Sequence, residues 1–146
     1  MLTSREHCEA EVRNKLLQRG FDEIVIDSAI EELKSYGYLS EARFAEAFLR
    51  YRMQRGEAPW MAAAKAQQRG VDESALQSAL QEVQGPFDAV QACRELLQSR
   101  DPERLRKHDE RVWQRHARFL RNKGYDAATI LRVLNEADLE LDEDMQ

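Results

Sequence analysis

A short pattern of basic residue, glycine, apolar residue and aspartate occurs three times along this chain of 146 residues. Its copies are Arg19-Gly20-Phe21-Asp22, Arg69-Gly70-Val71-Asp72 and Lys123-Gly124-Tyr125-Asp126, with glycines 50 and 54 residues apart. Each glycine can adopt the left-handed backbone that ends a helix, and each aspartate can cap the helix that follows. This role as helix punctuation is enough to explain both residues. The pattern predicts tandem helical units, whose long surface is typical of proteins that bind long partners.

The segment after each glycine carries apolar residues at the same four offsets of 6, 9, 10 and 13 positions. The three sets are Ile26, Ala29, Ile30 and Leu33, then Leu76, Ala79, Leu80 and Val83, then Ile130, Val133, Leu134 and Ala137. These offsets lie on one stripe of an α-helix, because one turn takes 3.6 residues. No segment shows the alternating β-branched pattern of a strand. We therefore predict an all-α fold of tandem three-helix repeats in an elongated, curved array.

Helix start and stop signals divide the chain into three repeats and a tail. We expect repeat 1 (residues 1–38) to be incomplete, with two helices, followed by repeat 2 (39–84), repeat 3 (85–138) and an acidic tail (139–146). The expected helices span residues 3 or 8 to 18, 22–36, 40–54, 59–69, 72–84, 86–99, 101–123 as one long helix or a kinked pair, and 126–137. Ser40 is the expected cap of the third helix, with Leu39 and Phe44 as a hydrophobic staple.

Periodicity also predicts which side chains point inward. The expected inward residues are Val12, Leu16 and Leu17 in the first helix, Phe44, Ala47, Phe48 and Tyr51 in the third, and Val112, Trp113, His116, Phe119 and Leu120 in the long helix. A repeat with only two helices leaves apolar surface uncovered. We expect Leu2, Tyr36 and Tyr38 to cover part of it.

Composition, the first residues and the cysteines limit the class of protein to which this chain can belong. The chain is 34% charged, and no apolar run approaches the roughly 18 residues that a membrane span requires. The first residues lack the apolar region of a signal peptide. Cys8 and Cys93 are far apart and without metal-ligand spacing, so we expect reduced thiols and a cytoplasmic protein.

Three segments resemble the RecX family of recombination regulators. They are His7-Cys8-Glu9-Ala10-Glu11-Val12-Arg13-Asn14-Lys15-Leu16, Gly37-Tyr38-Leu39-Ser40-Glu41-Ala42-Arg43-Phe44-Ala45 with Arg50-Tyr51-Arg52 after it, and Arg118-Phe119-Leu120-Arg121-Asn122-Lys123-Gly124-Tyr125-Asp126. They sample nearly the whole chain in the family's order. The resemblance implies a small cytoplasmic protein of three-helix repeats that binds RecA–DNA filaments and restrains the recombinase. It implies roles in DNA recombination, DNA repair and the SOS response.

The sequence departs from the family's pattern in three ways. Cys8 stands where serine or threonine is common, which weakens the side-chain cap there. A further N-terminal helix that relatives often carry is not found in the sequence. Ala62 and Ala66 replace larger aliphatic residues, so repeat 2 should pack more closely or be less stable. None of these changes removes the repeat pattern.

No catalytic constellation is present in the sequence. His7, His108 and His116 have no metal-ligand spacing, and there is no phosphate-binding loop or nucleotide fingerprint. His116 falls on an inward stripe, which favours a core role over proton transfer. We therefore expect no enzyme activity, no cofactor and no metal.

Basic residues supply the stronger candidates for binding. Residues 100–124 carry nine lysines and arginines against four acidic residues. Arg111, Arg115, Arg118 and Arg121 recur on one helix face, Lys123 follows, and Arg104, Arg106 and Lys107 extend the positive field upstream. Such a row suits phosphates or an acidic protein face. A solvated helix face that complements the helix dipole is the alternative.

A second candidate set is formed by Arg43, Arg50, Arg52 and Arg55. Ion pairs with Glu41, Glu46, Glu31 or Glu32 are the alternative to partner binding. Trp60 is a candidate partner-facing anchor. Residues 135–146 carry six acidic residues and no basic one, which is typical of a solvated tail but also fits a segment that covers a basic surface.

Two functions fit these features. The first is a monomeric regulator whose repeats bind the RecA filament and the single-stranded DNA within it, with direct DNA contact as one possibility. The second is a helical-repeat DNA-binding or adaptor protein without RecA specificity. The acidic second helices, such as Asp22-Glu23 to Glu31-Glu32, oppose entry into a DNA groove. Binding to duplex DNA alone would discriminate between the two functions.

Overall fold

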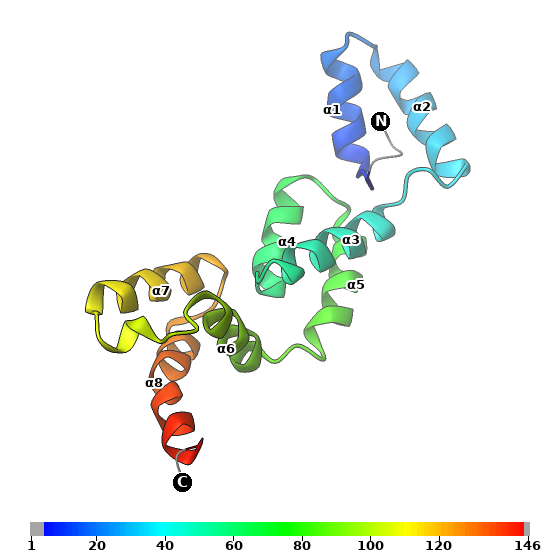
Figure 1. Cartoon of the computed structure of the whole chain (residues 1–146). Coiled ribbons are helices and arrows are strands. Elements are labelled where there is room, and N and C mark those ends of the chain that lie inside the picture. The colour runs from blue at the N-terminus through cyan, green and yellow to red at the C-terminus, as the bar shows by residue number, and fades with distance from the viewer. Residues whose placement is uncertain (1–4, 145–146) are drawn as a thin grey trace. The chain divides into compact units, whose positions relative to one another are not determined.

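The computed structural model describes residues 5–144, and the side chains of residues 5–135. This part of the chain contains eight α-helices and one 3-10 helix and no strand, which confirms the all-α prediction (Figure 1). The elements are α1 (Glu9–Gln18), α2 (Glu23–Ser35), α3 (Glu41–Gln54), α4 (Pro59–Gln68), α5 (Glu73–Gln84), α6 (Ala89–Arg100), η1 (Leu105–Lys107), α7 (Glu110–Asn122) and α8 (Ala127–Asp144).

These elements form two compact units. The N-terminal unit comprises Met1–Gln54 and Pro59–Gly85, and so contains α1 to α5. The C-terminal unit comprises Pro86–Gln146 together with Arg55–Ala58, the connection between α3 and α4. The division into three repeats of given boundaries stays a prediction.

The repeated glycine–aspartate turn has the predicted geometry in all three copies. Gly20, Gly70 and Gly124 have φ angles of 90°, 84° and 103°, in the left-handed region that glycine adopts without strain. The aspartate after each glycine accepts a hydrogen bond from a backbone N–H of the next helix. The Val25 N–H donates to Asp22 at 3.1 Å, the Ala75 N–H to Asp72 at 3.0 Å and the Thr129 N–H to Asp126 at 2.8 Å. Each helix pair is thus joined by a C-terminal glycine and an N-terminal cap.

The apolar stripe of the second helix in each pair points inward, as its spacing predicts. Ile26 and Ile30, Leu76 and Ala79, and Ile130, Val133 and Leu134 are buried. Leu33, Leu80 and Val83 pack at the edges of the same clusters. Ala137, the last member of the pattern, lies outside the described side chains.

Helix α3 packs against α4 and α5 to form the larger core of the N-terminal unit. Ala62, Ala63 and Ala66 of α4 are buried beside Phe44 and Leu49. The small side chains therefore allow α4 to pack closely in this core. The expectation that Ala47 and Tyr51 point inward is wrong, because both are exposed. Ala45 and Leu49 are buried in α3 instead, which moves its apolar stripe part of a turn from the predicted face.

Helices α1 and α2 form a hairpin with its own small core of Val12, Ile26, Ile30 and Leu39. Leu17 is exposed, contrary to the prediction. Tyr36 and Tyr38 are also exposed, so they do not cover this hairpin. Leu2 lies outside the described residues.

The start of α3 has the predicted cap but not the predicted hydrophobic staple. Ser40 accepts a hydrogen bond from the Arg43 N–H at 3.2 Å and is the predicted cap. Leu39 and Phe44 are both buried, but Leu39 belongs to the hairpin core and Phe44 to the core around α3. The two residues therefore anchor the turn to two different clusters.

The C-terminal unit packs α6 and α7 against α8. Its core holds Cys93, Leu97, Leu120 and Tyr125, together with Ala58 from the α3–α4 connection. The Ala58 N–H donates to the Lys123 carbonyl at 2.8 Å, which joins this connection to the α7–α8 turn.

Two segments of the C-terminal unit differ from the predicted helices. Residues 101–123 are not one helix: η1 is followed by a separate α7, capped by Asp109, whose carboxylate accepts from the Arg111 N–H at 2.9 Å. Arg104, before η1, has a left-handed φ of 57° that ends helical continuity. Helix α8 continues to Asp144, beyond the expected end at residue 137 and into the acidic tail.

Candidate partner-binding surfaces

Helix α7 presents a row of exposed basic side chains. Arg111, Arg115, Arg118 and Arg121, which we call the α7 basic row, are all exposed. The opposite stripe is inward, as predicted, with His116 and Leu120 buried and Trp113 and Phe119 half-buried. Within residues 5–135, no carboxylate forms a salt bridge with any of the four arginines. The α7 basic row therefore directs four cations toward solvent, available for an anionic partner.

Arg106 does not extend this row, contrary to the sequence prediction. Its side chain is buried, and its guanidinium lies 2.9 Å from the Asp101 carboxylate. Asp101 also accepts hydrogen bonds from the backbone N–H groups of Leu105 and Arg106. Burial alone would raise the pKa of Asp101, but these hydrogen bonds outweigh it and hold the pKa below its ordinary value. Arg106 is therefore a structural partner that fixes the η1 turn.

His116 completes this buried polar cluster. Its Nε2 lies 3.6 Å from Asp101, and its Nδ1 is buried with no hydrogen-bond partner in the described part of the chain. Burial lowers the pKa of His116, opposed by the Asp101 carboxylate and assisted by Arg100, Arg106 and Arg115. The imidazole is therefore neutral at pH 7, in agreement with the predicted core role.

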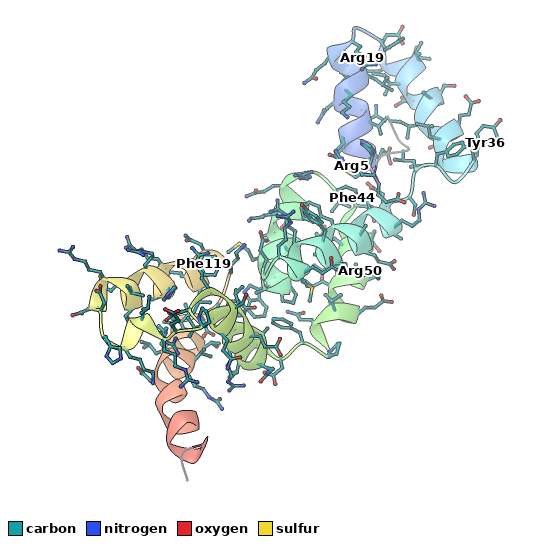
Figure 2. The ribbon with its side chains drawn as sticks, in the orientation of Figure 1. Arg5, Arg19, Tyr36, Phe44, Arg50 and Phe119 are labelled. Carbon is teal, nitrogen blue, oxygen red and sulfur yellow. The ribbon has the colours of Figure 1, made fainter. Side chains whose placement is uncertain are left out.

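Lys123 is only half-buried and lies beside an aromatic ring. Its Nζ is 5.6 Å from the centre of the Phe119 ring, and the Arg100 guanidinium lies 3.8 Å from the same centre (Figure 2 labels Phe119). Two cations at one ring stabilise the α6–α7 packing. Lys123 thus has an internal contact that the α7 basic row lacks.

The second predicted set of basic residues does not form one surface of equivalent side chains. Arg43 donates to the Gly37 carbonyl at 2.6 Å and pairs with Glu6 at 3.1 Å. The Arg52 guanidinium lies 5.3 Å from the Phe48 ring centre. Arg50 is exposed on α3 (Figure 2), whereas Arg55 is exposed but belongs to the C-terminal unit. Arg43 therefore holds the N-terminal unit together, and its expected ion pairs with neighbouring glutamates of α2 and α3 are replaced by these contacts.

Glu41 is a structural residue that sequence reasoning did not single out. One carboxylate oxygen accepts from the Glu9 N–H at 3.3 Å and the other from the Asp72 N–H at 3.2 Å. Glu41 therefore links the starts of α1, α3 and α5. Its place between Ser40 and Arg43 in the family-like motif is the signal that could have identified it.

The described residues offer little for catalysis or metal binding. Burial raises the pKa of Cys8 and of Cys93 to about 11, so both thiols stay protonated at neutral pH. No cluster of three potential metal-ligating side chains occurs in the part of the chain that the structure describes. None of the described helices has the length and apolarity to cross a membrane. Trp60, the candidate anchor, is exposed at the start of α4.

Comparison with known proteins identifies the family. Residues 1–33 match the model for the first three-helix domain of RecX, and residues 40–80 match the model for the second. The chain is 34% identical to the regulatory protein RecX of Pseudomonas entomophila over 95% of this chain and 88% of that protein. It is 32% identical to the regulatory protein RecX of Halorhodospira halophila over 94% of this chain and 84% of that protein.

A solved structure shows the same fold at low identity. A crystal structure of regulatory protein RecX aligns with 90% of this chain at a TM-score of 0.65 and 16% identity. The chain spans 65% of the length of that protein. The two domain models and the relatives at 32–34% identity show that this chain belongs to the RecX family of regulatory proteins.

Proposed function

We propose that this chain regulates homologous recombination by binding RecA–DNA filaments and inhibiting the recombinase and ATPase activities of RecA. Membership of the RecX family supports a regulatory role. The α7 basic row is the observation that supports direct contact with the filament, because its four arginines lie on one face and have no internal carboxylate partner among residues 5–135. The protein acts as a cytoplasmic monomer without cofactor, metal or catalytic site.

The α7 basic row contacts the anionic component of the filament in this proposal. Phosphates of the enclosed single-stranded DNA or an acidic face of RecA present the charge that arginines bind. Arg50 adds a further exposed cation on the N-terminal unit. Arg52, Arg55 and Lys123 keep a candidate binding role, whereas Arg43 contributes by holding the N-terminal unit in shape.

Charge reversal of the row tests the proposal. The variant Arg111→Glu/Arg115→Glu/Arg118→Glu should bind preformed RecA–single-stranded DNA filaments at least about tenfold more weakly, because three favourable charge contacts become repulsive. Co-sedimentation measures binding, and ATP hydrolysis and strand exchange measure inhibition. The matched variant with lysine at the same three positions keeps the charge and should retain most of the affinity. Unchanged inhibition by the glutamate variant, with helicity preserved, would exclude the row as the contact.

Binding to DNA alone distinguishes the alternative function. A helical DNA-binding protein without RecA specificity would shift duplex or single-stranded DNA equally well in the absence of RecA. The exposed acidic residues of α2, which include Asp27, oppose insertion of that helix between phosphates. We expect filament binding to exceed binding to either naked DNA.

A further inference from the structure

A phenylalanine ring on α7 holds two cations that no carboxylate of the described side chains neutralises. The Arg100 guanidinium lies 3.8 Å from the centre of the Phe119 ring, and the Lys123 ammonium lies 5.6 Å from it (Figure 2 labels Phe119). The two cationic groups are therefore within about 9.4 Å of each other. An aromatic ring attracts cations but has no net charge, so the positive charge of the pair remains.

The N-terminal unit contains the same arrangement with an anion in place. The centre of the Phe48 ring lies 5.3 Å from the Arg52 guanidinium and 5.1 Å from the Arg69 guanidinium. Arg69 precedes the glycine of the second repeated turn, as Lys123 precedes the glycine of the third. The Glu11 carboxylate lies 3.6 Å from Arg69 and partly neutralises this pair of cations. The group that such a pair accepts is thus an oxyanion.

No carboxylate takes the corresponding place at the Phe119 ring. In the part of the chain whose side chains are described, no acidic residue forms a salt bridge with Arg100 or Lys123. The acidic residues nearest to them in sequence have other partners. Asp101 pairs with a buried arginine at 2.9 Å, and Asp126 accepts a backbone N–H of α8 at 2.8 Å. An oxyanion at this ring therefore comes from elsewhere.

The acidic end of the chain is poorly placed to supply this oxyanion. Helix α8 begins at Ala127, shortly after Lys123 in sequence, and continues to Asp144. An α-helix rises 1.5 Å per residue, so the 18 residues of α8 span about 27 Å. Residues 139–144 therefore occupy the end of α8 that is remote from Lys123. The anion that fits the two cations is one that a partner brings.

The side chains around the ring match the phosphates of a nucleic acid strand. Arg115 lies one turn before Phe119 on α7 and Lys123 one turn after it, so the three residues follow one line along the helix. Arg115 is exposed and belongs to the α7 basic row, which continues the positive charge across the helix. A single strand carries a phosphate on every nucleotide and can contact successive cations of such a line, whereas an acidic protein face needs a carboxylate placed opposite each one.

We propose that the cations around Phe119 form a phosphate-binding site for the single-stranded DNA in the filament. The site, which we call the Phe119 site, consists of Arg100, Arg115, Phe119 and Lys123. This inference rests on the proposed function and deepens it, because it names DNA phosphate as the ligand and adds Arg100 to the residues that bind it. A cation held at a ring loses less side-chain freedom on binding than a cation in solvent. The Phe119 site therefore binds phosphate with cations that are already in position.

Neutralisation of the two cations at the ring tests the site with a ligand that contains no protein. The variant Arg100→Gln/Lys123→Gln should bind a fluorescein-labelled single-stranded oligothymidylate at least about tenfold more weakly than the wild type at low salt, by fluorescence anisotropy. The plot of log affinity against log salt concentration should become less steep by about 1.4, the change expected for two contacts with single-stranded DNA. The variant Arg94→Gln/Arg132→Gln removes the same charge from α6 and α8, and it should bind nearly as the wild type does.

A charge-retaining variant separates phosphate binding from packing. The variant Arg100→Lys/Lys123→Arg keeps both charges next to the ring and should retain most of the affinity for the oligothymidylate. Circular dichroism and urea unfolding monitor the fold of every variant. If the neutral double variant unfolds, Lys123→Gln alone repeats the measurement, with an expected change in slope of about 0.7. Unchanged affinity in a folded neutral variant, or an equal loss in the charge-retaining and neutral variants, would overturn the phosphate site.

Filament binding distinguishes this inference from the proposed function. The neutral variant should bind preformed RecA–single-stranded DNA filaments more weakly, in parallel with its weaker binding to the oligothymidylate. Weaker filament binding with unchanged oligothymidylate binding would place an acidic face of RecA at the ring and overturn the assignment to DNA. If the wild type binds the oligothymidylate through this site but does not sediment with filaments, the proposed function fails and the phosphate site stands.

Discussion

Arg43 and Arg50 lie on the same helix but differ in what their side chains contact. Arg43 binds the Gly37 carbonyl and the Glu6 carboxylate, whereas Arg50 is exposed with no carboxylate partner in the described residues. Arg43→Ala should lower the free energy of unfolding of the N-terminal unit by about 1 kcal/mol, since a hydrogen bond and a surface ion pair are lost. Arg50→Ala should change it by less than about 0.5 kcal/mol. Native-state hydrogen exchange of amides in α1 to α3 measures both, and equal effects would contradict the structural role of Arg43.

His116 gives the C-terminal unit a defined response to pH. Its pKa in the folded protein lies below the ordinary value of 6.5, chiefly because it is buried. As pH falls through about 6.5, the unfolded chain binds a proton that the folded chain does not, so stability decreases. Asp101 stays ionised in this range because its pKa is lowered. The ionised Asp101 carboxylate stabilises the folded state at pH values above the pKa of an aspartate in the unfolded chain. This stabilisation is lost only as the pH falls below that value, through the lower pKa of the folded state.

The measurement is the free energy of unfolding of the C-terminal unit between pH 7.5 and pH 5, by hydrogen exchange. The free energy of unfolding of the wild type should fall on acidification. His116 alone contributes at most about 1.4 kcal/mol per pH unit to this fall. His116→Gln should show a smaller loss over the same range. His7 in the N-terminal unit, whose pKa is also lowered, mainly by burial, is common to both proteins and cancels in the comparison. A parallel decline in the two proteins would exclude His116 as the source.

At the scale of elements, the same turn has different neighbours in different repeats. A Cβ atom on Gly70 would lie 2.9 Å from the Ala10 Cβ, whereas one on Gly20 would meet no atom within 4 Å. Both glycines have positive φ, so alanine costs about 1 kcal/mol at either position from backbone strain alone. Gly70→Ala should cost about 1–3 kcal/mol more than Gly20→Ala, because α1 and the α4–α5 turn must separate.

Thermal or urea unfolding of the two glycine variants checks this difference. Gly20→Ala is the control for backbone strain, and the excess in Gly70→Ala reports the contact between α1 and the α4–α5 turn. Equal destabilisation would show that the contact with Ala10 relaxes without cost.

The contacts around α1 explain much of the family-like motif. Glu41 bonds the starts of α1 and α5, and the Cys8 thiol lies 3.7 Å from the Arg69 carbonyl to which it donates. Glu11 accepts the Cys8 N–H at 3.2 Å, which supplies one half of a capping box. Cysteine at position 8 therefore serves as a buried residue of the core more than as a helix cap.

For the whole molecule, the response of filament binding to salt reports what the α7 basic row contacts. The variant Arg111→Glu/Arg115→Glu/Arg118→Glu would lose three phosphate contacts. The plot of log affinity against log salt concentration should then become less steep by about 2, which is the change expected for three contacts with single-stranded DNA. A salt series of filament co-sedimentation measures the slope for the glutamate variant and for the wild type. Equal slopes in the two proteins would show that the α7 basic row does not contact the DNA.

The local elements of this protein follow from its sequence. The left-handed glycines, the aspartate caps and the apolar stripe of α2, α5 and α8 depend on residues within a few positions of each other, so spacing alone predicts them. The absence of strands in the described residues follows from the same helical periodicity. The exposed face of α7 was also predictable, because one strongly amphipathic helix defines its own two sides.

Tertiary structure decided the rest, because it depends on residues that are distant in sequence. Leu39 and Phe44 are five residues apart yet belong to different cores, and the inward face of α3 is set by α4 and α5. Arg106 was predicted as surface charge, but the turn around Asp101 buries it. Val71 and Phe21 occupy the same position of the repeated turn, and only the neighbours of each repeat decide that Val71 is buried while Phe21 is exposed. Periodicity specifies which side of a helix is apolar, whereas the neighbouring helices determine whether that side is covered.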